Sequence, residues 1–159
     1  MKDISELSKC LEDMGEVLEK HLMDAQSKAA DLMWQDAYAN ARRDTGAYAL
    51  SIHKEPTEIV DGKIETFIGS GMQVMNSKGD IYNLGALLEY GTDPHLIEPV
   101  NCDYLHFKTD DGKWVKTKLV HHPGTPKYNT YRNARLNNEV EYQNLLAEAI
   151  LKAFEEGFK

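Results

Sequence analysis

The chain has 159 residues, which fits one domain with a core of its own, and we expect a single domain over residues 1–159. The apolar share of 42% and the charged share of 28% exclude a wholly disordered chain, and no run of about 18 apolar residues indicates a membrane span. The formal net charge of -8 disfavours sequence-specific DNA binding, because an acidic surface repels phosphate unless basic residues cluster locally.

Residues 1–42 carry the strongest periodic signal in the chain. Apolar residues from Ile4 to Leu32 recur at steps of three and four, which places them on one face of a helix, and no proline interrupts the run. Gly15 is the weakest position, since glycine costs about 1 kcal/mol relative to alanine inside a helix. We predict one long N-terminal helix.

Residues 43–127 predict antiparallel hairpins. The stretch from Leu50 to Ile68 is extended in character, and Asp61-Gly62 at its centre suits a type I′ turn, in which both central residues need positive φ. Residues 69–80 are rich in Gly, Ser and Asn and are expected as a loop.

A short helix and a second hairpin follow. Residues 82–90 place leucines on one helical face, and Gly91 is suited to end that helix. Residues 104–109 and 113–120 flank a turn sequence at 110–112, and helical spacing returns over 128–159. Because hairpins alternate with helices, we predict an α+β fold with a short middle helix and a C-terminal helix packed on one sheet face.

Three short motifs, taken in this order, resemble a family of tailed-bacteriophage proteins known as minor tail, tail-completion or head-tail joining proteins. The first is a threonine-glycine turn before a serine-isoleucine pair, the second an apolar-glutamate-aromatic-glycine-threonine segment, and the third a histidine-proline-glycine turn. Their residues are Thr45-Gly46 with Ser51-Ile52, Leu88-Glu89-Tyr90-Gly91-Thr92, and His122-Pro123-Gly124-Thr125.

The resemblance, which spans about residues 45–134, implies a structural protein without enzyme activity or cofactor. It implies a homo-oligomeric ring of six subunits around the DNA passage, in contact with other neck and tail proteins of the virion. DNA would pass close to the ring without sequence-specific contact.

Glu89 has two interpretations within that motif. Its carboxylate either pairs with a basic residue of the same or a neighbouring subunit, or remains solvated at a helix end. We expect Gly91 and Thr92 to have structural roles, because glycine permits a helix to end and threonine can form a local hydrogen bond.

Histidines and aspartates in the middle of the chain raise the alternative of a small metal-dependent hydrolase, since zinc binds imidazole and carboxylate. The spacing lacks His-x-x-x-His and Cys-x-x-Cys, and adjacent strand residues point to opposite faces, so we expect no metal site. The residues concerned are His95, His106, His121, His122, Asp93, Asp103, Asp110 and Asp111.

The N-terminal helix is expected to form the subunit interface. Its apolar stripe is longer than one small sheet can cover, and an uncovered stripe marks an interaction surface, to which we assign Leu11 and Leu18. No signal-peptide-like apolar run follows Met1, so we expect synthesis and retention in the host cytoplasm. In that reducing compartment Cys10 and Cys102 are expected as thiols.

Overall fold

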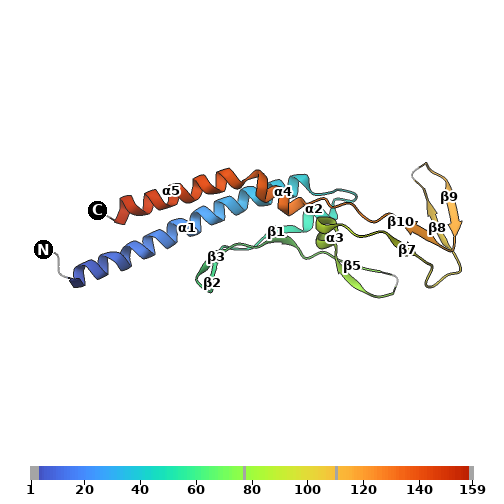
Figure 1. Ribbon diagram of the computed structural model, residues 1–159, viewed down its shortest axis with the longest axis horizontal. Helices are drawn as coiled ribbons and strands as arrows, with labels where there is room; N and C mark the ends of the chain where they lie inside the picture. The colour runs from blue at the N-terminus through green and yellow to red at the C-terminus, as the bar shows by residue number, and fades with distance from the viewer. Residues whose placement is uncertain (1–3, 77, 110, 158–159) are drawn as a thin grey trace. The chain divides into compact units, whose positions relative to one another are not determined.

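The computed structural model, drawn in Figure 1, describes residues 4–76, 78–109 and 111–157. Its contacts group into two compact units. Unit 1 comprises Met1–Ala41, Ile52–Gly69 and Tyr131–Lys159, and unit 2 comprises Arg42–Ser51 and Ser70–Thr130. The predicted α+β class is confirmed: a long N-terminal helix, antiparallel strand pairs, a short middle helix and C-terminal helices.

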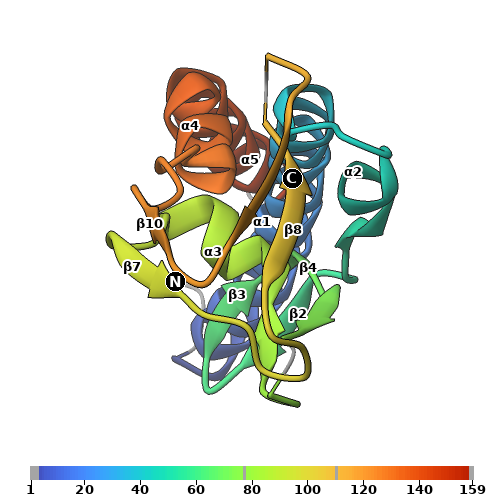
Figure 2. The same ribbon diagram turned by 90° about the vertical axis from the view of Figure 1, so that its right-hand side faces the viewer.

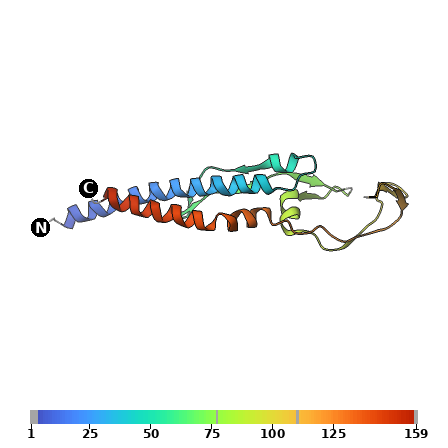
Figure 3. The same cartoon turned by 90° about the horizontal axis from the view of Figure 1, so that it is seen from above.

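Helix α1 runs without a break from Ile4 to Asn40 in unit 1, as its apolar spacing predicts, and passes through Gly15. Helix α5 (Glu139–Gly157) lies alongside it (Figures 1 and 3). Small residues allow the close approach: the alanines of both helices that face the contact are buried, namely Ala25, Ala29, Ala149 and Ala153. The partner of the C-terminal helix is therefore mainly α1.

The C-terminal segment forms two helices where we predicted one over 128–159. Helix α4 (Thr130–Asn137) ends before Asn138, and α5 begins at the next residue. The Asn138 side-chain amide donates to the Ala134 carbonyl oxygen at 2.8 Å. In a continuous helix the Asn138 backbone amide would donate to this oxygen, so the side chain competes with the helical hydrogen bond. Asparagine at this position accounts for the break.

Unit 1 also holds two short strand pairs, β1 (Ile52–Lys54) with β4 (Ile68–Ser70) and β2 (Glu58–Val60) with β3 (Lys63–Glu65); only Ser70, the last residue of β4, is assigned to unit 2. Asp61 and Gly62 have φ of 50° and 74°, which confirms the predicted turn between β2 and β3. Strand β1 is attached to α1 by Trp34, whose Nε1 donates to the Ile52 carbonyl oxygen at 3.0 Å.

Two predictions for the stretch around residues 47–83 were wrong. Residues Ala47–Ser51 form a short helix, α2, so the extended region begins at Ile52 and not at Leu50. The expected loop over 69–80 contains strand β5 (Gln73–Met75), which pairs with β6 (Ile81–Asn83). The Asn76 Oδ1 accepts from the amides of residues 78 and 80, both at 2.9 Å, and these bonds close the hairpin turn.

The rest of unit 2 begins with α3 (Leu84–Tyr90), which starts two residues later than predicted because residues 82 and 83 belong to β6 and the Asn83 side chain caps the helix. Gly91 ends the helix, as predicted. The hairpin predicted around residues 110–112 is confirmed as β8 (Leu105–Lys108) with β9 (Trp114–Thr117). Strands β7 (His95–Ile97) and β10 (Val120–His122) form a further pair that the sequence did not indicate (Figure 2).

The strands of the described residues form five separate two-stranded pairs. Within the same residues, no helix combines the length and the apolar character needed to cross a bilayer.

Candidate functional site

Two of the three family-like motifs lie against each other in unit 2. The Thr92 amide donates to the Thr125 carbonyl oxygen at 3.0 Å, and the Thr125 amide donates to the Thr92 side-chain oxygen at 2.9 Å. Residues 33 positions apart in the sequence are thereby joined by a reciprocal pair of hydrogen bonds. We call this contact, with the adjoining Gly91 and Gly124, the threonine clamp.

The clamp requires glycine on both sides. Gly91 has φ of 71°, as its position at the helix stop predicts, and a Cβ there would lie 2.5 Å from the Thr125 carbonyl oxygen. Gly124 has φ of 89°, and a Cβ there would collide with the Thr92 carbonyl oxygen. Any side chain at either position therefore meets both backbone strain and backbone atoms.

The chain that follows the clamp completes the end of α3. The amides of Tyr128 and Asn129 donate to the carbonyl oxygens of Leu88 and Glu89, at 2.9 and 3.4 Å. These carbonyls belong to the last turn of α3 and lack partners within the helix. Glu89 itself is only 7% exposed, which excludes the solvated interpretation of its carboxylate.

The threonine-glycine motif forms the expected turn. The Thr45 side-chain oxygen accepts from the Ala47 amide at 3.3 Å, and the Gly46 carbonyl oxygen accepts from the Leu50 amide at 3.1 Å. Gly46 has φ of 85°, and the turn leads into α2 and not directly into a strand. Arg42, just before the turn, places its guanidinium carbon 4.9 Å from the centre of the Tyr128 ring. All residues of the three motifs except Ile52 belong to unit 2.

The histidines are held in strand and turn contacts. His95 and His122 occupy matched positions on β7 and β10, and their rings stack with centres 4.9 Å apart. The His122 Nδ1 accepts from the Gly124 amide at 3.1 Å, which ties this ring to the turn at the clamp. His106 lies on β8, with the centre of its ring 4.9 Å from that of Trp114 on β9.

No group of three or more His, Cys, Asp or Glu side chains that could hold a metal ion occurs among the residues that the structure describes. Asp110, one of the aspartates considered for such a site, lies outside them. Cys10 and Cys102 are free thiols, half-buried and exposed respectively.

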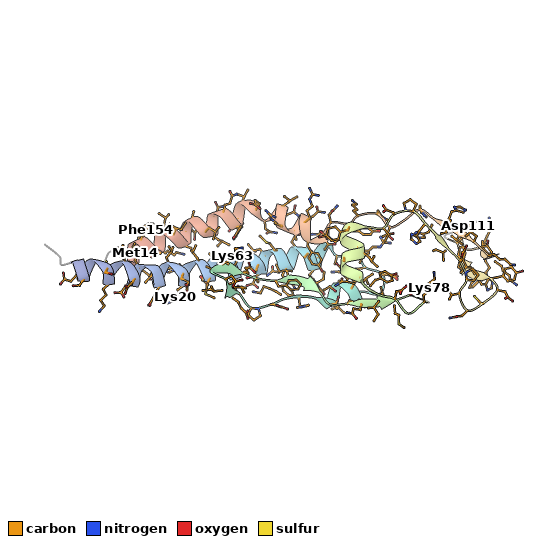
Figure 4. The ribbon with its side chains drawn as sticks, turned by 60° about the horizontal axis from the view of Figure 1, so that its bottom comes forward. Met14, Lys20, Lys63, Lys78, Asp111 and Phe154 are labelled. Carbon is orange, nitrogen blue, oxygen red and sulfur yellow. The ribbon has the colours of Figure 1, made fainter. Side chains whose placement is uncertain are left out.

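Exposed apolar side chains form the second feature with functional meaning. On the helix pair of unit 1, Leu11 is 55% exposed, Val140 71% and Phe154 47%. A shallow apolar hollow of about 110 Å³ lies between the helices, and Met14 and Phe154 lie next to each other there (Figure 4). Its lining residues are Leu11, Met14, Gly15, Leu18, Ala153 and Phe154.

Sequence reasoning placed Leu11 and Leu18 on the apolar stripe but did not indicate that α5 covers part of it. The exposed apolar face of α5, which includes Val140, Leu151 and Phe154, was also missed as an interaction surface. The sequence contained a signal for this face, because these apolar residues alternate along the helix with the alanines that are buried.

Comparison of the chain with family models, with curated proteins and with solved structures finds no match.

Proposed function

We propose that this protein is a structural component of the head-tail junction of a tailed bacteriophage, where its subunits assemble as a ring around the DNA passage. The ring has six subunits in the proposal, and other neck and tail proteins bind its two sides. The motif resemblance supports this function, and so does the clamp, in which two of those motifs contact each other.

The observation that carries the proposal is the distribution of apolar side chains. Among the described residues, the buried apolar side chains are all alanines except Tyr48 and Ile52. Larger apolar residues lie outside, among them Met75, Trp114 and Val140, each more than half exposed. Large exposed apolar residues next to a core of small ones are typical of a subunit whose remaining core is formed with its neighbours.

The strand pairs support the same conclusion. A two-stranded pair is marginally stable in water by itself, and each such pair leaves two unpaired edges that invite further strands. In an assembled ring, neighbouring subunits would pair with these strand edges and cover the exposed apolar side chains. In the helix pair, Leu11 and Leu18 stay our proposed contact residues.

A joining assay tests the proposal. A phage carrying this gene with an early stop codon is grown on a non-suppressing host, and the lysate is mixed with purified full-length protein. We expect DNA-filled heads and tails that stay separate without the protein, and complete infectious particles, counted by electron microscopy and plaque assay, once it is added. Complete particles in the untreated lysate, or virions whose mass spectra lack this chain, would contradict the proposal.

The hydrolase alternative makes a different prediction. Stoichiometric zinc or manganese in the purified protein, together with hydrolytic activity lost on chelation, would favour it over the assembly function. The described residues contain no group of three or more His, Cys, Asp or Glu side chains placed to hold such an ion.

A further inference from the structure

The β8–β9 hairpin, which we call the ribbon, has two chemically different faces. Directly opposite residues of an antiparallel pair share a face, and faces alternate along each strand. The pairs Leu105↔Thr117 and Phe107↔Val115 form an apolar face. The pairs His106↔Lys116 and Lys108↔Trp114 form a face that is basic and aromatic.

Contacts just beyond the paired residues extend the basic-aromatic face. The Lys116 Nζ lies 4.3 Å and the Lys118 Nζ 5.3 Å from the centre of the Tyr104 ring. Cation-π contact with one ring holds both ammonium groups close together. The His106 and Trp114 rings are also in contact, and Trp114 is 67% exposed.

This face is locally positive in a chain of net charge -8. Residues 105–108 and 114–117 contain no aspartate or glutamate. At the turn, the carboxylate of Asp111 is paired with the Lys113 ammonium at 2.8 Å, so its charge is compensated. Lys116 and Lys118 therefore lie close together over one ring, and Lys108 lies on the same face of the ribbon. The natural partner of such a cationic face is a polyanion.

We propose that the basic-aromatic face of the ribbon binds duplex DNA through its backbone phosphates. The inference rests on the proposed function, in which a ring encloses the DNA passage, and it names the element that contacts the DNA. The shape agrees, because the major groove of B-form DNA admits a two-stranded β-ribbon. Phosphate contacts by lysines position a protein on DNA without reading its sequence.

The binding is weak and strongly dependent on salt. Three lysines that neutralise three phosphates give a slope of about -2.7 in log affinity against log salt, so affinity falls roughly 40-fold between about 50 and about 200 mM salt. The remaining acidic surface of the chain opposes tighter binding. A contact of this strength guides DNA and allows it to slide.

Fluorescence anisotropy of a short labelled duplex of random sequence, titrated with full-length protein at both salt concentrations, tests the inference. We compare Lys108→Gln/Lys116→Gln/Lys118→Gln with a control, Lys20→Gln/Lys63→Gln/Lys78→Gln, in which exposed lysines on other elements are replaced (Figure 4). Both variants lose three positive charges, so each has a net charge of -11. We expect the ribbon variant to lose duplex binding and the control to retain it within about threefold.

A charge-preserving variant separates binding from folding. Lys108→Arg/Lys116→Arg/Lys118→Arg should bind as the parent does, and circular dichroism should show that all three variants are folded. If the ribbon variant misfolds, duplex binding by the arginine variant is compared with duplex binding by Lys118→Gln, since Lys118 lies outside the paired residues. Weaker binding by Lys118→Gln supports the inference, and equal binding contradicts it.

Several outcomes would overturn the inference. The first is no duplex binding at about 50 mM salt and about 100 µM protein, and the second is equal duplex binding by the ribbon and control variants. The third is a preference for single-stranded DNA that Trp114→Ala removes, because such a preference indicates base stacking on Trp114. Sedimentation in which only the ribbon variant loses self-association would instead assign this face to a second copy of the chain.

The joining assay keeps this inference distinct from the proposed function. If virions need the protein and the purified chain binds no duplex, the ribbon inference fails alone. If the ribbon binds duplex DNA and the virions lack the chain, the proposed function fails alone.

Discussion

The helix pair α1–α5 and the strand pairs of unit 2 differ in how much of their structure they complete within one chain. In the helices, backbone hydrogen bonds close inside each helix, and buried alanines such as Ala29 and Ala153 bring the two axes together. In the strand pairs, each strand has one partner, and apolar residues such as Met75, Ile81 and Trp114 are exposed. The helix pair is therefore expected to persist in the free protein, whereas the strand pairs depend more on turns, on the clamp and on neighbouring molecules.

The largest effect should come from breaking the clamp that holds unit 2 together. Gly91→Val places a β-branched residue at positive φ against the Thr125 carbonyl oxygen, and we expect a loss of about 2–3 kcal/mol in the free energy of unfolding. The melting midpoint, followed by circular dichroism, should fall by roughly 5–10 °C.

The matched control is Gly71→Val in the same unit, because nothing lies within 4 Å of a Cβ at Gly71. If both variants melt at the midpoint of the parent, the clamp does not contribute to stability.

The alanine contact of the helix pair should be the next most sensitive place. Ala29 is 1% exposed, and Ala29→Leu forces extra methyl groups between α1 and α5, which should cost about 2 kcal/mol. Ala147→Leu, at an exposed position of α5, should change the free energy of unfolding by less than about 0.5 kcal/mol. Equal melting midpoints for the two variants would show that the helices do not pack closely through Ala29.

Charges on the apolar stripe test whether the helix pair also contacts other molecules. Leu11→Glu/Leu18→Glu should abolish concentration-dependent self-association measured by sedimentation, because unpaired charges are costly in an interface. Since Leu11 is largely exposed and Leu18 lines the hollow, we expect a stability loss of about 1 kcal/mol.

Gln35→Glu/Asn144→Glu adds the same two charges at exposed positions and serves as the control. Self-association equal to that of the parent would remove Leu11 and Leu18 from the proposed interface. Complete unfolding would assign both leucines to the core of the subunit.

The smallest effect concerns the turn of the ribbon. A hydrogen bond from Lys113, joined by one from Thr109, lowers the pKa of Asp111 below its ordinary value of 3.8. The lowered pKa stabilises the folded state above about pH 3.8, and this contribution disappears as the pH falls through the folded-state pKa. Titration by NMR should show Lys113→Gln raising the Asp111 pKa toward 3.8. An unchanged Asp111 midpoint in that variant would mean that Lys113 is not the main cause.

The sequence predicted the elements whose signal is local. The period of α1, the Asp61-Gly62 turn and the Gly91 stop each depend on residues within a few positions of one another, and each is confirmed. The β7–β10 pair was missed because its strands have three residues each and lie more than 20 positions apart. The sequence also did not indicate the division into two units, because each unit is built from stretches of the chain that alternate with those of the other.

The candidate site was predicted in part. The motifs that hold Gly91 and His122 were identified as landmarks, but nothing in the sequence indicated that Thr92 and Thr125 would bond to each other. The two strands of the ribbon were predicted on either side of the turn at residues 110–112. The face that its lysines and aromatic residues share became apparent only once the register of β8 and β9 was known.

The threonine clamp also bears on how this protein can vary. By joining Thr92 to Thr125, it closes the chain from β7 to β10 into a loop with fixed ends. The entropy of closing a loop grows only with the logarithm of its length, so doubling the enclosed chain would cost about 0.6 kcal/mol. A longer or shorter ribbon can therefore be accommodated without altering α3 or the clamp, which makes ribbon length a variable on which selection can act independently of the rest of the fold.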